Sequence, residues 1–205
     1  VAIFSSYLIL ALISYFEMRR YMTKNSFADY KMILSSPLAP SISLVAPAYN
    51  EGLTIIENVK SLMSIEYNNY DIIIVNDGSK DDSLEKMQQA FDLKKVDFLI
   101  DRTLPCNDIR AIYKSQNRAY KKLIVVDKVN GGKADALNAG INISNKELVA
   151  CIDVDCIIQP DALLKMVKPY LEDRENTVAI GGVVRIANSC IVEEGRLIKV
   201  NLPES

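Results

Sequence analysis

The chain has 205 residues, which is enough for one α/β domain of ordinary size. Its formal net charge is −2, so it lacks the basic surplus with which proteins bind nucleic acid. It contains no histidine, which excludes Ser-His-Asp triads, histidine acid–base catalysis and zinc sites built on histidine.

The first sixteen residues carry no charge, and Arg19, Arg20 and Lys24 follow them. Sixteen helical residues span roughly 24 Å, less than the ~30 Å of a bilayer core. The chain starts with valine, however, so we expect a fragment whose helix has lost its first turns. We predict a transmembrane helix over residues 1–22 at the inner (plasma) membrane, with the remainder cytoplasmic. The alternatives are a core helix and a signal peptide. A signal peptide needs a basic leader and a small-residue cleavage site, and neither is visible in the sequence.

The four cysteines show neither a CxxC pair nor the spacing of a metal site. One of them, Cys151, lies in a run that we interpret as a buried strand, so we expect reduced packing thiols in a cytosolic domain. Residues 23–41 contain Pro37 and Pro40 and are predicted to be a juxtamembrane linker.

From residue 42 onward, apolar runs alternate with amphipathic segments. This alternation predicts an α/β fold with a mostly parallel, doubly wound sheet and helices on both faces. Ser79 and Asp82 resemble a capping box, Gly140 is expected to end a helix, and Pro47 to stop the first strand. The expected strands are 42–46, 70–75, 96–100, 123–126, 148–153 and 178–184, and the expected helices are 53–63, one after Ser79, 133–138 and one from Pro160 that Pro169 perturbs.

Two carboxylates, Asp153 and Asp155, follow the apolar run 148–152. In an extended chain these two side chains share one face, roughly 6–7 Å apart. Their repulsion calls for a cation, and a divalent metal with oxygen ligands is the simplest one. A solvated turn or a helix cap is an equally common use of such a pair.

Polar groups follow three further strands, and in a parallel sheet all these strand ends meet at one edge. Tyr49 offers a ring for stacking on a base, and carboxylates can accept hydrogen bonds from base or ribose groups. A glycine pair before a helix lets the backbone approach a phosphate, and a lysine adds positive charge. Taken singly, each of these groups is as readily a packing ring or part of a turn. Together they predict a site for a nucleotide diphosphate. The predicted members of this site are Tyr49, Glu51, Asp77, Gly131, Gly132, Lys133, Asp153 and Asp155.

Four strings carry a resemblance to a known family: SLVAPAYNE, IIIVNDGSKDDS, VNGGKADALNAG and ACIDVDCIIQPDAL. In order and spacing they resemble the family 2 glycosyltransferases over residues 42 to about 188. The helix ahead of the domain makes the chain most similar to membrane-embedded polysaccharide synthases of the poly-N-acetylglucosamine, hyaluronan and chitin type. The resemblance implies a GT-A (Rossmann-like) fold and a donor-binding, truncated catalytic domain over 42–205.

The resemblance also implies roles for single residues. Pro47, Tyr49 and Glu51 would hold the uracil and ribose of a UDP-sugar, and Asp77 would read the uracil. Lys133 would contact the diphosphate. Beside the nucleotide, Asp153 would help Asp155 coordinate Mg²⁺ or Mn²⁺.

An inverting transferase also needs a carboxylate base, which the family keeps in its second half. The chain has no tryptophan, so the Gln-x-x-Arg-Trp motif of processive members is absent. Glu193 and Glu194 are interpreted as solvated, so the base is expected beyond Ser205 and this segment is expected to be inactive alone.

The resemblance implies that the enzyme transfers a sugar from a UDP-sugar, UDP-N-acetylglucosamine or UDP-glucose, to a growing polysaccharide. The acceptor would be a saccharide or a lipid-linked molecule. Three alternatives stay open. A polyprenyl-phosphate glycosyltransferase shares the donor motifs, and a non-catalytic nucleotide-binding domain could retain them. A haloacid-dehalogenase phosphatase fits less well, because its DxDx[TV] signature comes early in the chain whereas Cys156 and Ile157 follow Asp155.

Overall fold

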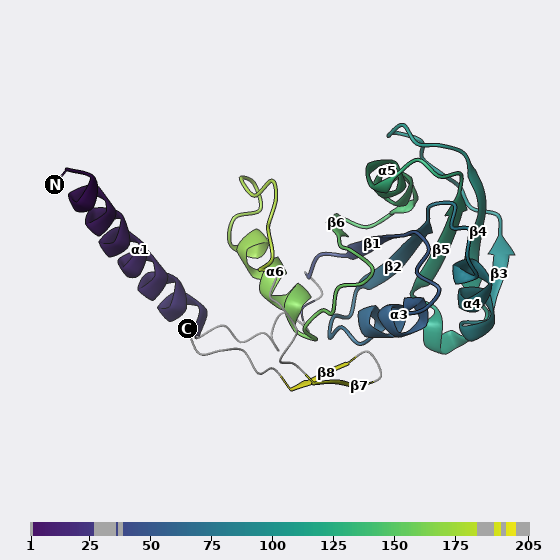
Figure 1. Cartoon of the computed structure of the whole chain (residues 1–205), viewed down its shortest axis with the longest axis horizontal. Coiled ribbons are helices and arrows are strands. Elements are labelled where there is room, and N and C mark those ends of the chain that lie inside the picture. Colours follow the sequence, from purple (N-terminus) through teal and green to yellow (C-terminus); the bar gives the residue numbers. More distant parts are fainter. Residues whose placement is uncertain (1, 27–35, 37–38, 184–190, 194–195, 200–205) are drawn as a thin grey trace. The chain divides into compact units, whose positions relative to one another are not determined.

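The computed structural model describes residues 2–26, 36, 39–183, 191–193 and 196–199. The chain divides into two compact units, residues 1–37 and residues 38–205. The first unit contains one helix, α1 (Ala2–Ser26), which is shown in purple in Figure 1.

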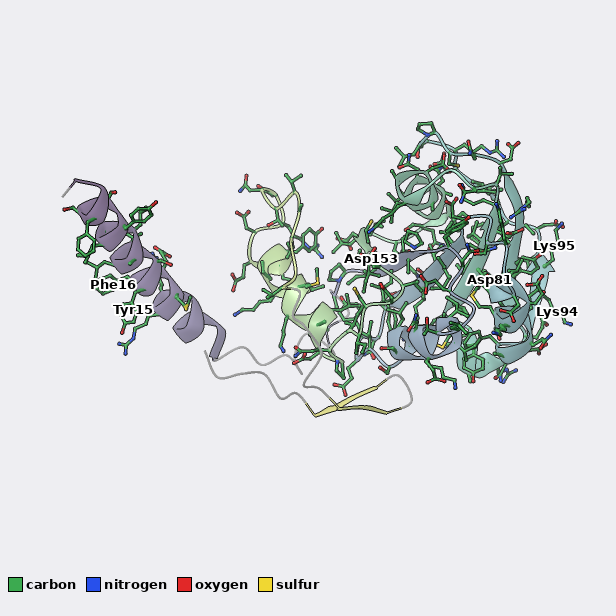
Figure 2. All side chains as sticks on the ribbon, viewed as in Figure 1. Tyr15, Phe16, Asp81, Lys94, Lys95 and Asp153 are labelled. Atoms are coloured by element: carbon green, nitrogen blue, oxygen red, sulfur yellow. The ribbon has the colours of Figure 1, made fainter. Side chains whose placement is uncertain are left out.

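Apolar side chains of α1 are exposed along its length, for example Phe4 (74%), Leu10 (60%) and Phe16 (66%). Near its end, the Arg19 guanidinium stacks 5.4 Å from the ring centre of Tyr15, a residue labelled in Figure 2. Within the described residues, no helix combines the length and apolarity that crossing a bilayer requires. The transmembrane helix predicted over residues 1–22 is therefore not confirmed.

The second unit is built on a six-stranded sheet in the order β3-β4-β5-β2-β1-β6. Four neighbouring strands run parallel, and the two strands at one edge are joined by antiparallel pairing, so the predicted α/β class is confirmed with a mixed sheet. The parallel strands are β5 (Leu123–Lys128), β2 (Tyr70–Asn76), β1 (Ile42–Ala48) and β6 (Leu148–Cys151), and the antiparallel ones are β3 (Leu93–Val96) and β4 (Ile109–Ser115).

Helices cover both faces of this sheet (Figure 1). On one face lie α3 (Ile55–Met63) and α4 (Ser83–Ala90), and on the other lies α5 (Lys133–Ile143). Because side chains alternate along a strand, β1 and β2 present apolar residues to both layers, and all their residues are buried except Pro47 and Asp71, which are partly exposed. The remaining elements are η1 (Arg118–Tyr120), α6 (Ala162–Glu172) and a hairpin of β7 (Ile191–Glu193) and β8 (Arg196–Lys199).

The prediction that Pro47 stops the first strand was wrong, because β1 continues through Pro47 to Ala48. The carbonyl of Val45 accepts a hydrogen bond from Ile152 N (3.0 Å), so Val45 and Pro47 direct their backbone groups toward β6. Pairing with β6 ends at Val45. The N–H that proline lacks therefore has no partner to lose at this position.

α4 begins at Ser83, and its N-cap residue, Asp82, makes no side-chain capping bond. The predicted capping box was wrong, because the Ser79 hydroxyl instead accepts a hydrogen bond from the backbone N–H of Asn50 at 3.0 Å. Ser79 therefore joins the loop after β2 to the loop after β1 and does not cap α4.

β6 was predicted as a buried strand over 148–153, and this was wrong. It is a four-residue edge strand, with Val149 39% exposed and Cys151 exposed. An apolar run alone does not distinguish a central strand from an edge strand, because that depends on which strands pair beside it. The carboxylates that follow β6 therefore lie in an exposed loop.

Other boundaries moved as well. Residues 101–120, where no strand was predicted, contain β4, and β3 ends at Val96, where the prediction began a strand. Residues 178–183 form no strand, and residue 184 lies outside the described residues, as does Cys190. α6 begins two residues after Pro160 and contains Pro169 near its end.

Gly140 does not end α5, which continues to Ile143. A Cβ atom at this position would overlap Cγ1 of Val45 and lie 3.2 Å from Cγ2 of Val75. Gly140 therefore permits close approach between α5 and the two central strands.

We predict that Gly140→Ala lowers the free energy of unfolding by about 1–3 kcal/mol, the usual cost of overpacking a core. Urea denaturation followed by circular dichroism measures this loss. The matched control is Gly181→Ala, where an added Cβ has no neighbour within 4 Å. Equal stability of the two variants would contradict the packing role.

Candidate functional site

The site lies where the parallel strands end. β5, β2, β1 and β6 are neighbours in the sheet and run in the same direction, so the loops that follow them meet at one edge (Figure 1). Every predicted site residue except Pro47 lies in these loops or at the first position of α5. Pro47 is half-buried within β1, two residues before Tyr49.

The loops after β1 and β2 are joined by backbone-to-side-chain hydrogen bonds. Asn50 adopts a left-handed conformation (φ 57°) and its Oδ1 accepts from Lys80 N at 2.8 Å. Glu51 N donates to the Ser83 hydroxyl at 3.0 Å. These bonds fix the backbone directly after Tyr49, a residue that is 45% exposed and accessible to a ligand.

Asp81, labelled in Figure 2, completes this junction and was missed by the sequence analysis. Its carboxylate accepts from Gly52 N (2.9 Å), Ser83 N (3.1 Å) and the Ser83 hydroxyl (2.5 Å). Desolvation alone would raise the pKa of Asp81, but these hydrogen bonds outweigh it and lower the pKa below its ordinary value. The available signal was the adjacent acidic pair Asp81 and Asp82, which lies in the first turn of the helix expected after Ser79.

Asp77 follows β2 and is only 3% exposed. Its Oδ1 accepts from Lys128 Nζ (2.7 Å) and Gly131 N (3.0 Å), and its Oδ2 accepts from Gly132 N (2.8 Å). Both carboxylate oxygens thus hold the glycine loop. The predicted contact of Asp77 with uracil is untested, and the structure gives this residue a loop-positioning role.

Lys128, the last residue of β5, is fully buried between two carboxylates. Its ammonium pairs with Asp77 at 2.7 Å and also with Asp135 in the first turn of α5. Burial alone would lower the pKa of Lys128, but the hydrogen bonds and charges of Asp135 and Asp77 hold it above its ordinary value. The sequence analysis missed Lys128, because a lysine that ends a strand more commonly points into solvent.

Gly132 precedes α5 with φ 87°, a conformation that favours glycine. The chain turns here so that Lys133 becomes the first helical residue, where backbone N–H groups lack partners within the helix. Lys133 is 63% exposed and forms an ion pair with Asp153, which raises the pKa of Lys133 through a hydrogen bond and opposite charge. The structure thus joins the predicted phosphate-binding lysine to the predicted metal loop.

Oxygen and sulfur atoms of Asp153, Asp155 and Cys156 lie within 4.8 Å of one another. The two exposed carboxylates are hard donors that suit Mg²⁺ or Mn²⁺. Burial, followed by the charges of Asp155 and Asp153, raises the pKa of the Cys156 thiol, and sulfur is a softer ligand than the two carboxylates. The donor set therefore fits a divalent metal on Asp153 and Asp155, with water and phosphate oxygens as further ligands.

The sequence pattern of glycosyl transferase family 2 matches residues 43–194. The chain belongs to this family. The four strings that suggested the resemblance all lie within this segment, in its strands, in the loops that follow them and in parts of α4, α5 and α6.

Among curated relatives, poly-beta-1,6-N-acetyl-D-glucosamine synthase of Staphylococcus epidermidis is 33% identical over 147 residues. The synthase of the same name from Staphylococcus aureus strain COL is 30% identical over 147 residues. Each alignment covers 72% of this chain but only 29% of the relative. The chain therefore spans less than a third of the length of these relatives.

Solved structures with a similar chain course include mannosyltransferase PcManGT from Pyrobaculum calidifontis in complex with GDP-Man and Mn²⁺. That chain is 20% identical with a TM-score of 0.48, and the match covers 69% of this chain and 37% of the other. S. aureus TarS 1-349 in complex with UDP-GlcNAc is also 20% identical with a TM-score of 0.48, with coverage of 65% and 32%.

We predict that Lys128→Met destabilises the protein by about 3–5 kcal/mol, because the buried carboxylate of Asp77 and the partly exposed carboxylate of Asp135 lose their shared cation. Urea denaturation measures the change. Lys60→Met is the control, since Lys60 pairs with Glu57 on the exposed surface of α3 and should contribute less than about 1 kcal/mol. Similar stability of the two variants would show that the buried cluster is unimportant.

Proposed function

We propose that this chain is the donor-binding part of a glycosyltransferase that takes a sugar from UDP-N-acetylglucosamine and extends a saccharide. The observation that carries the proposal is the contact between Lys133 at the start of α5 and the Asp153–Asp155 loop. It brings one cation and two candidate metal ligands to the edge of the sheet where Tyr49 is exposed. The names of the curated relatives support N-acetylglucosamine as the sugar and a polysaccharide as the product.

Binding of the donor would use the loop after β1 and the start of α5. The exposed ring of Tyr49 can stack on uracil, and Glu51 beside it can accept hydrogen bonds from the nucleoside. The diphosphate would lie at the first turn of α5, because its unpaired N–H groups and the helix dipole favour anions. The N–H groups of Gly131 and Gly132 already donate to Asp77, so Lys133 supplies the main charge for the phosphates.

Transfer of the sugar leaves a nucleoside diphosphate on which negative charge develops. Lys133 stabilises this charge once the diphosphate displaces its ion pair with Asp153. A divalent ion on Asp153 and Asp155 would, when bound, act as a Lewis acid on the same oxygens. The carboxylate base for an inverting reaction is proposed to come from residues outside this chain, since Asp77 and Asp135 are engaged by Lys128.

We predict that this chain binds UDP in the presence of Mn²⁺, that Asp155→Asn weakens binding at least about tenfold, and that the chain alone transfers no sugar. Removal of one metal ligand explains the loss. Isothermal titration with and without Mn²⁺ measures it, and Asp97→Asn, an exposed carboxylate far along the chain, is the control. Metal-independent binding, or equal affinity of the Asp155 variant, would contradict the metal site, and turnover would contradict the external base.

We further propose that α1 attaches the protein to a membrane. Its described side chains include large exposed apolar groups from Phe4 to Met18, and its first charged residue is Glu17. Exposure of so many apolar side chains to water is unfavourable, at about 25 cal/mol per Å². Insertion into lipid removes this cost.

For the membrane attachment, we expect Ile9→Lys with Ile13→Lys to abolish flotation of the chain with phosphatidylcholine vesicles. Two lysines in the apolar part of α1 would each oppose burial in lipid. The control replaces Leu99 and Val178, which are 95% and 98% exposed in the second unit, with lysine. Flotation unaffected by the α1 changes, or lost equally in the control, would contradict attachment through α1.

A further inference from the structure

A cavity of about 320 Å³ lies at the opposite edge of the sheet from the donor site. Its lining includes Asp71 at the start of β2, Lys122 immediately before β5 and Lys146 before β6. These positions mark the beginnings of parallel strands, whereas the donor loops follow their ends. The length of β2 separates the two places by roughly 20 Å, at ~3.3 Å per residue.

Four lysines line this cavity and only one carboxylate accompanies them, so its net charge at neutral pH is positive. The four are Lys114, Lys121, Lys122 and Lys146. A fifth cation is close, because Lys94 on β3 pairs in register with Lys114 on β4 and so projects from the same face. We name the cavity that these four lysines line the lysine groove.

Two ammonium groups of the lysine groove are held in place by aromatic rings. Lys122 Nζ lies 3.8 Å from the ring centre of Tyr70 and donates to the Tyr67 carbonyl at 3.2 Å. Lys114 Nζ lies 4.9 Å from the ring centre of Phe98. Cations fixed in this way lose little conformational freedom when a ligand binds, unlike lysines that extend into solvent.

Carboxylate compensation in the groove is incomplete. Asp71 Oδ2 approaches Lys146 Nζ only to 4.0 Å, and Asp71 Oδ1 is buried with no hydrogen-bond partner. Burial, and then the like charge of Lys121, lower the pKa of Lys122. The protein thus places cations together at a concave site and leaves most of their charge unmatched.

We propose that the lysine groove binds a phosphate-bearing anion, at a site separate from the donor site. A phosphate offers several acceptor oxygens to converging ammonium groups, which a single carboxylate does not. The groove is partly apolar, with Ile124 and Ile143 in its lining, so bound phosphate is shielded from water on one side. The same chemistry would serve a soluble phosphorylated molecule or a lipid headgroup.

The test is titration of inorganic pyrophosphate into the full chain in detergent with EDTA, which removes metal from the donor site. We expect Lys121→Gln with Lys146→Gln to weaken binding at least about tenfold, as expected for loss of charge-assisted hydrogen bonds. The charge-matched control is Lys60→Gln with Lys95→Gln. Lys60 lies on α3, and Lys95 pairs with Tyr113 and so projects from the opposite face to Lys94.

Figure 2 labels Lys94 and Lys95 on the outer strand, and only the first belongs to the groove side. Lys133→Gln tests the donor site and should leave groove binding unchanged. Absence of pyrophosphate binding, equal affinity of the groove variant and the wild type, or equal weakening in the control would overturn the proposal. Running the same titrations in the Lys133→Gln background separates these results from UDP binding, because Lys133 is the proposed diphosphate ligand of the donor site.

The source of the phosphate is decided by vesicles of phosphatidylcholine with or without phosphatidate. If only the groove variant loses the extra binding that phosphatidate provides, the site takes a lipid headgroup. If the groove variant loses pyrophosphate affinity but keeps its vesicle binding, the site takes a soluble phosphate. Both results support the groove, and a variant unaffected in both assays refutes it.

Discussion

The ammonium group of Lys128 lies without solvent exposure between the carboxylates of Asp77 and Asp135, and the sheet edge that carries the candidate site depends on this contact. Asp77 follows β2, Lys128 ends β5 and Asp135 belongs to the first turn of α5. One buried cation therefore joins two strands and a helix. Asp77 extends the same network to the backbone of Gly131 and Gly132, which sets the position of Lys133.

The charges of this edge form two layers. Inside, Lys128 is neutralised by protein carboxylates and is inaccessible to a ligand. Outside, Lys133 pairs with Asp153 in a contact that is more than half exposed on both sides, so phosphate and metal can replace the two partners. Separating a buried ion pair costs much free energy, whereas separating an exposed one costs little. The buried pairs of Lys128 therefore suit a structural role, and the exposed pair of Lys133 suits exchange with a ligand.

The central strands were predictable, because β1, β2 and β5 are apolar runs with β-branched residues at the spacing of an α/β sheet. β4 was not predictable, since its sequence alternates weakly and it depends on pairing with β5. β6 was predicted as buried from its composition, but its place at the edge follows from the order of the strands. Gly140 had the local pattern of a helix end, and only its contact with Val45 shows why glycine is needed there.

The sequence by itself determined the family and the order of its polar motifs, because each motif is a local string that follows an apolar strand. The tertiary structure decided how these residues are used. Asp77 and Lys133 both belong to polar motifs after strands, yet one is buried under the glycine loop and the other faces solvent. Burial and charge pairing arise between residues 51 and 54 positions apart, so a local pattern carries no record of them.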